Sequence, residues 1–154
     1  MLIENQIDVL KKGRNLMYKL VQDLSMEQIN HIPKGHKNHI GWNIAHLVVT
    51  QQLLCYQFSG LELNIPEKWV NLYKKGTNAL SNVITQEEWG LILQKFLELP
   101  DQLENDYRAN KFENYTEYKT SVNVVLDGID KAVDFNNFHE GIHLGVLLAQ
   151  KKLV

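Results

Sequence analysis

The last part of the chain contains the segment that decides the fold, Phe138-His139-Glu140-Gly141-Ile142-His143-Leu144-Gly145. Two histidines four residues apart leave the same face of an α-helix, with Cβ atoms about 5–6 Å apart. At that spacing their imidazoles can converge on one metal ion at bond lengths of about 2.0–2.1 Å. The alternative interpretation is a pair of hydrogen-bonded histidines in the core or rim of a bundle.

The helix around this pair is predicted to start at Asp127, as its N-cap, and to run to about Lys152. The residues that share the histidine face are mostly apolar, which is typical of a helix packed in a bundle. They are Ala132, Val133, Asn136, His139, His143, Val146 and Leu147. We therefore expect both histidines to point inward, where a buried imidazole needs a partner.

The same string matches H-E-x-x-H, the motif in which zinc proteases use the glutamate as general base. That motif needs a third ligand, which metzincins supply downstream. Residues 144–154 contain no His, Asp, Glu or Cys, so the protease interpretation is disfavoured.

A third ligand is better sought upstream, in a helix predicted from an N-cap at Asn38 to about Phe58, before Gly60. His39, Trp42, His46 and Thr50 share one face of it by steps of three and four residues. His46 lies within an apolar run, where a buried imidazole is costly unless its nitrogens have hydrogen-bond partners or metal ligation. Paired with His139 and His143, it forms a three-His site, and three protein ligands with open positions is the catalytic pattern.

The remaining periodicity is also helical. We expect a helix over 4–24, a loop over 25–38, a long connection with one helical turn over 61–84, and a helix that starts with a capping box at Thr85. Proline costs about 3 kcal/mol inside a helix, so Pro100 predicts a kink or a break. Residues 109–126 are predicted to be irregular. The fold class is all-α, a four-helix bundle with a long crossover connection, in a single domain over 1–154.

Composition narrows the function. The 16 Lys and Arg residues against 18 Asp and Glu give a net charge of −2, which argues against a nucleic-acid partner. The single cysteine, Cys55, excludes an intramolecular disulfide, and it is expected to be a buried small hydrophobe rather than a nucleophile. We see no membrane-spanning apolar run and no leader, so a cytoplasmic location is expected.

The segments Gly41-Trp42-Asn43-Ile44-Ala45-His46-Leu47 and Phe138–Gly145 resemble the two signature blocks of the DinB-like superfamily, which includes the bacillithiol transferases. The resemblance spans nearly the whole chain in length and helix order. It implies a four-helix bundle with a divalent metal, zinc or nickel, held by His46, His139 and His143. It also implies a homodimer, and a thiol S-transferase or related hydrolase with a low-molecular-weight thiol as co-substrate.

Other residues near these blocks have candidate roles. Glu140 is a candidate catalytic base, or alternatively part of a solvated or interhelical salt bridge. Trp42, Asn136 and His39 are candidate substrate-binding residues. Core packing is the more frequent role of such a tryptophan, and Asn136 is alternatively an ordinary polar residue at the rim of the bundle. The pocket walls are expected from residues 25–38 and 61–84. The basic loop 33–39 is a hypothetical binding site for the carboxylates of a thiol cofactor or acidic substrate.

A second function class stays open at this point. The chain is alternatively a non-catalytic dimeric bundle with a structural or vestigial metal site that binds a ligand or partner.

Overall fold

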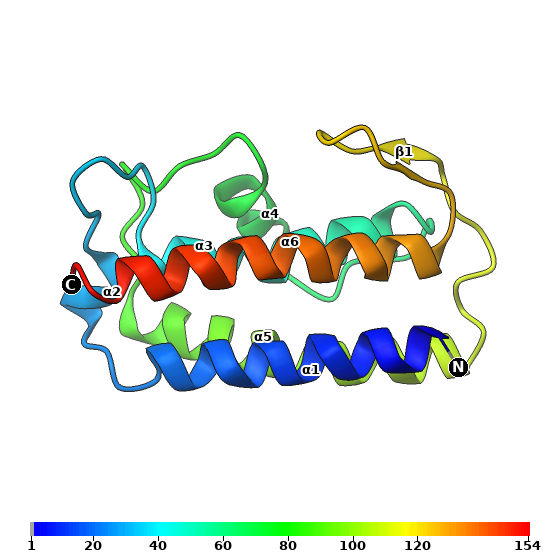
Figure 1. The fold of residues 1–154 in the computed structure, drawn as a ribbon, viewed down its shortest axis with the longest axis horizontal. Helices are drawn as coiled ribbons and strands as arrows, with labels where there is room; N and C mark the ends of the chain where they lie inside the picture. Colours follow the sequence, from blue (N-terminus) through cyan, green and yellow to red (C-terminus); the bar gives the residue numbers. More distant parts are fainter. Residues whose placement is uncertain (1) are drawn as a thin grey trace.

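The computed structural model describes residues 2–154, and within them four long helices form the bundle (Figure 1). These are α1 (Leu2–Val21), α3 (Ile40–Gln52), α5 (Gln86–Arg108) and α6 (Ile129–Gln150). Figure 1 shows α3 and α5 running in the same direction, with α1 and α6 antiparallel to both. The all-α class and the crossover between the second and third long helices are thereby confirmed.

Shorter elements join these helices. Helix α4 (Glu67–Tyr73) is the helical turn predicted within the crossover, and α2 (Met26–Asn30) follows α1. A small antiparallel hairpin, β1 (Tyr118–Lys119) with β2 (Val125–Leu126), precedes α6 and pairs Tyr118 with Leu126. Of the helices that the structure describes, none combines the length and the apolar character needed to cross a bilayer.

Two local predictions were wrong for reasons visible in the capping contacts. Residues 25–38 are not all loop, because Ser25 accepts the Gln28 amide and the Gln28 side chain accepts the Ser25 amide, a capping box that starts α2. The N-cap of α3 is His39, not Asn38, since the His39 Nδ1 accepts the Trp42 amide at 2.9 Å.

The other boundaries lie close to the prediction. Thr85 caps α5 by accepting the Glu88 amide, as expected. Helix α6 starts after Gly128 rather than Asp127. Helix α3 continues through a π-helical turn, η1 (Leu53–Gln57), and the chain then turns at Gly60, whose φ of 72° suits glycine. Single π-helical turns are frequent at functional sites, because they re-aim the side chains beyond them.

Pro100 does not break α5, which continues to Arg108. Proline has no N–H, so the carbonyl of Phe96, four residues earlier, loses its helical donor. The Arg14 guanidinium supplies a substitute, because its Nη1 donates to the Phe96 oxygen at 2.9 Å. The helix survives the proline because α1 satisfies the carbonyl that the proline leaves free.

The apolar core is divided into two clusters along the bundle. Met17, Trp42 and Phe96 belong to one cluster, and Ile7 and Leu103 belong to the other. Between them lies a layer of buried polar side chains: Arg14, Gln51, Gln52, Asn136 and Glu140. The candidate site is built beside this layer, from α3 and α6.

Candidate metal centre

Three imidazoles converge between α3 and α6. His46 comes from α3, His139 and His143 come from α6, and one nitrogen of each lies within 4.8 Å of the other two. The Nε2 atoms of His46 and His139 are 3.2 Å apart. The structure therefore brings together all three histidines expected to be metal ligands.

Hydrogen bonds on the outer side of the cluster orient two of these rings. His46 Nδ1 lies 2.6 Å from the carbonyl oxygen of Tyr73, which can only accept, so this nitrogen carries the proton. His143 Nδ1 lies 2.8 Å from Asn43 Oδ1. Asn43 is itself fixed, because its Nδ2 donates to the carbonyl of His39 at 2.9 Å. In the neutral rings, both Nε2 atoms are then left with free lone pairs.

Burial keeps the three rings neutral. Desolvation is the main cause that lowers the pKa of His46, His139 and His143, to about 4 for His139 and about 3 for His143. The neighbouring imidazoles lower the last two further, because a second positive charge would repel the first. Neutral imidazole is the form that binds metal ions.

The donor set fits a divalent cation. Without a metal, His139 Nε2–H can donate to the His46 Nε2 lone pair at 3.2 Å, but His139 Nδ1 then stays buried without a hydrogen-bond partner among the described residues. An additional proton on these rings is disfavoured by their lowered pKa values, whereas a metal ion with open coordination positions can accept a lone pair from each of the three rings. The partners of His46 and His143 are the outer contacts that metal-bound histidines use to fix their tautomer.

Trp42 supports the site from outside the cluster. Its ring stacks on His46 with centroids 4.6 Å apart and an interplanar angle of 11°. The indole Nε1 donates to Thr77 Oγ1 at 3.3 Å. Trp42 is thus held by the crossover segment, and it fixes the plane of a predicted ligand rather than lining the cavity described below.

Glu140 lies in the polar layer between the two apolar clusters. Its carboxylate forms an ion pair with the Arg14 guanidinium, with Arg14 Nη2 donating to Glu140 Oε1 at 2.7 Å. Asn136 Nδ2 donates to the same oxygen at 3.0 Å. Arg14 is 0% exposed and Glu140 5% exposed, so the pair is buried. This geometry favours the salt-bridge alternative for Glu140 and places Asn136 with it.

His39 is engaged at both ring nitrogens. In addition to capping α3, its Nε2 lies 3.1 Å from the carbonyl of Asn82 and donates to it. The basic loop before it is tied to the end of α6, because Gln150 Nε2 donates to the carbonyl of Asn38 at 2.8 Å. These contacts favour a structural role for His39.

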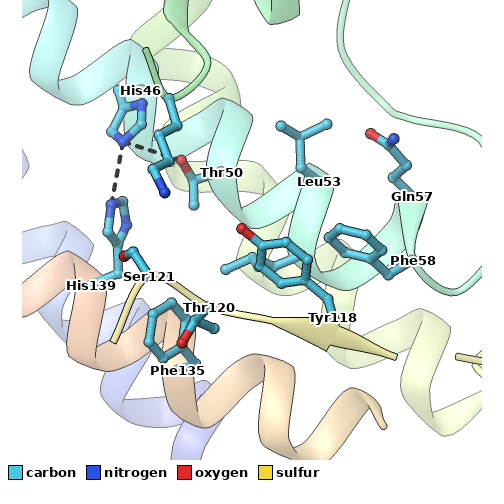
Figure 2. Close-up of a pocket in the computed structure, with 12 residues that line it drawn as sticks. His46, Thr50, Leu53, Gln57, Phe58, Tyr118, Thr120, Ser121, Phe135 and His139 are labelled. Atoms are coloured by element: carbon cyan, nitrogen blue, oxygen red, sulfur yellow. Dashed lines mark hydrogen bonds between the residues drawn. The ribbon is translucent and has the colours of Figure 1, made fainter. Parts of the chain in front are cut away.

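A cavity of about 340 Å³ opens at the histidines (Figure 2). Figure 2 shows His46 and His139 at one end and Phe58 with Tyr118 toward the other. Its walls were predicted from 25–38 and 61–84, and this was largely wrong: among the described residues, Lys75 alone comes from those segments. The rest come from α3, η1 and its C-cap Phe58, residues 118–121, and α6: His46, Thr50, Leu53, Leu54, Gln57, Phe58, Tyr118, Thr120, Ser121, Phe135 and His139.

Trp42, Asn136 and His39 are not among the residues that line this cavity. The aromatic side chains that do line it were missed, as was Arg14. A signal for Arg14 is present in the sequence, because it falls between Leu10 and Met17 at the spacing of the buried stripe of α1. The approach of residues 118–121 to α3 depends on long-range packing and leaves no comparable pattern.

Comparison with known proteins identifies the family. The sequence model of the DinB superfamily matches residues 10–147, which is most of the chain and includes all three histidines. A search of curated proteins finds no match.

Proposed function

From the premise that this chain belongs to the DinB superfamily, we propose that it is a metal-dependent enzyme that transfers a low-molecular-weight thiol to a small electrophile, or hydrolyses a related substrate. One observation carries the proposal: three neutral imidazoles converge, and two of them, His46 and His139, line one end of a cavity large enough for a small molecule. Sites for small ligands occupy about 300–1,000 Å³. His46, His139 and His143 are the proposed ligands of zinc or nickel.

A divalent metal ion held there would lower the pKa of a bound thiol or water and so supply a nucleophile at neutral pH. The chain's own residues hold the ligands in place. Tyr73 and Asn43 fix the outer nitrogens of His46 and His143, and Trp42 fixes the plane of His46. The Thr50 hydroxyl, 3.4 Å from His46 Nε2, faces the same cavity and can orient a reacting group there.

An external thiol fits this chain better than a protein nucleophile. Cys55 is fully buried, and burial raises the pKa of its thiol to about 12, so it remains protonated at neutral pH. Three neutral ligands also leave the two positive charges of the metal uncompensated, which favours an anionic ligand such as a thiolate.

The alternative is a non-catalytic bundle whose metal is structural or vestigial. One observation favours it: among the described residues that line the cavity, none is a carboxylate that can act as general base. Glu140, proposed from the sequence as a base, is bound to Arg14 instead.

The test is the rate at which the protein transfers a low-molecular-weight thiol to the electrophile monochlorobimane. This rate is measured with chelator-treated protein and with protein reconstituted with zinc or nickel. We expect activity only in the reconstituted protein, and its loss in His139→Gln. His31→Gln is the matched control, because His31 is exposed and lies outside the cluster. Equal rates with and without metal would contradict the proposal, and metal binding without any turnover would favour the alternative.

We also propose a homodimer, as family membership implies. An outer groove between α1 and α6, lined by Val9, Gly13, Gly141 and Leu144, is the surface proposed for the second copy. Val9 is 60% exposed there. Light scattering should give twice the monomer mass for wild type and a lower mass for Val9→Glu. A cytoplasmic location and the lack of a nucleic-acid partner stay predictions from the sequence.

A further inference from the structure

The cavity beside the histidines has an aromatic wall. The rings of Phe58 and Tyr118 stack with centroids 4.6 Å apart and an interplanar angle of 20°. Phe135, from α6, and Leu53, from η1, line the same cavity (Figure 2). Flat apolar ligands gain most from such walls, because aromatic pairs add favourable contact beyond the area that they bury.

The described residues that line the cavity carry charge of one sign only. None of the twelve described residues that line it is acidic, and Lys75 is the charged one among them. The nearby buried carboxylate, Glu140, is compensated by Arg14. With a divalent metal on three neutral imidazoles, this cavity is therefore strongly positive, and in a partly apolar setting that charge is weakly screened.

Resting on the proposed metal centre, we infer that the cavity selects an amphipathic organic anion with a planar apolar group. The anionic group, a carboxylate or thiolate, lies at the histidine end. The planar group lies against Phe58, Tyr118 and Phe135. Lys75 adds positive charge to the same cavity and contributes to selection for the anion.

The first experiment measures, by calorimetry, the binding of three probes to the zinc-loaded protein. 3-Phenylpropionate carries both features, 3-phenylpropanol lacks the charge, and propionate lacks the ring. We expect 3-phenylpropionate to bind about tenfold more tightly than either of the others. Equal affinity for 3-phenylpropionate and either probe would overturn the inference.

Two variants test the walls. Phe135→Ala should weaken the binding of 3-phenylpropionate by about tenfold and leave the binding of propionate unchanged. Lys75→Gln should weaken the binding of both anions. The expected effect is only about threefold, because Lys75 is exposed and its charge is partly screened. The neighbouring Lys74→Gln is the control, since Lys74 is also exposed but does not line the cavity. An equal effect of the two lysine variants would contradict the role of Lys75.

Zinc stoichiometry is measured on the same samples, so the two proposals fail separately. Stoichiometric zinc without the probe preference overturns this inference and leaves the metal centre intact. Absence of bound zinc, and of bound nickel when nickel is supplied instead, overturns the proposed function together with the anionic part of the inference. The ring preference is then decided on metal-free protein by comparing 3-phenylpropionate with propionate.

Discussion

His46 and His139 are 93 residues apart in the chain, and their Nε2 atoms lie 3.2 Å apart. His46 is protonated at Nδ1 toward the Tyr73 carbonyl, and burial disfavours a second proton, so its Nε2 presents a lone pair to His139. Two helices that pack through apolar residues thus bring the His46 Nε2 lone pair to His139, whose Nδ1 is buried without a partner among the described residues. This contact is the physical basis for expecting a cation between α3 and α6.

Asn43 is predicted to set the affinity of the site without binding metal itself. Its Oδ1 accepts from His143 Nδ1, and loss of such an outer partner typically lowers metal affinity by about 10–100-fold. Asn43→Leu should lose that much zinc affinity in competition with a chromogenic chelator. Asn43→Asp retains the acceptor but loses the Nδ2 donor to the His39 carbonyl, so it should lose less zinc affinity than Asn43→Leu. Wild-type affinity in the leucine variant would contradict this role.

Arg14 and Glu140 are predicted to stabilise the bundle as a pair. Removing one member leaves an uncompensated buried charge, so Arg14→Met should lower the free energy of unfolding by about 3–5 kcal/mol. The double variant Arg14→Met/Glu140→Leu should recover the part of the loss that comes from the unpaired Glu140 charge, but not the part that comes from the Phe96 carbonyl left without a donor. Urea denaturation measures this. Additive losses in the double variant would show that the two residues act independently.

Glu140→Gln separates the structural role from a catalytic one. If the carboxylate serves Arg14, the variant loses stability but keeps its zinc stoichiometry and its turnover per folded molecule. If Glu140 is a base, turnover falls while the urea midpoint stays near wild type. The contacts with Arg14 and Asn136 predict the first result.

Cys55 is predicted to be inert in the native protein. The raised pKa of its fully buried thiol keeps it protonated, so Ellman's reagent should label it only after denaturation. Cys55→Ala should retain metal content and thiol transfer. Rapid labelling of the folded protein, or loss of activity in this variant, would revive a nucleophilic role.

The metal-free protein is predicted to lose stability in mild acid. In the folded state the pKa of His139 is about 4 and that of His143 about 3, both below the ordinary value of 6.5. The unfolded chain therefore binds more protons as the pH falls through 6.5, and folding stability declines from there to about pH 3. Thermal unfolding in the presence of a chelator should show a Tm that falls as the pH is lowered over this range. His139→Gln/His143→Gln should flatten this dependence, and an unchanged slope would assign the acid sensitivity to other groups.

The long helices and the three-His cluster were accessible from sequence, because both depend on local spacing. Helix geometry places His139 and His143 on one face, and the apolar neighbours of His46 in the sequence mark it as an unusual position for a histidine. Helix α2 was missed although Ser25 and Gln28 carry its capping box. The contacts of Glu140 were not accessible in the same way, since its partner Arg14 lies 126 residues away on another helix.

The cavity walls illustrate a similar limit. Tyr118 and Thr120 lie in a segment without helical periodicity, and they line the cavity beside the histidines only because the hairpin packs beside α6 and η1. Spacing along a helix predicts which residues share a face. It does not predict which distant segment covers that face.

The most direct test of the account is the metal content of freshly purified protein, measured by elemental mass spectrometry. Wild type is compared with His46→Ala and His143→Ala, and with His31→Ala as the control. We expect about one zinc or nickel ion per chain in wild type and in the control, and loss of metal in both cluster variants. No metal in wild type after supplementation with zinc and nickel, or full retention in His46→Ala, would contradict a centre that joins α3 to α6.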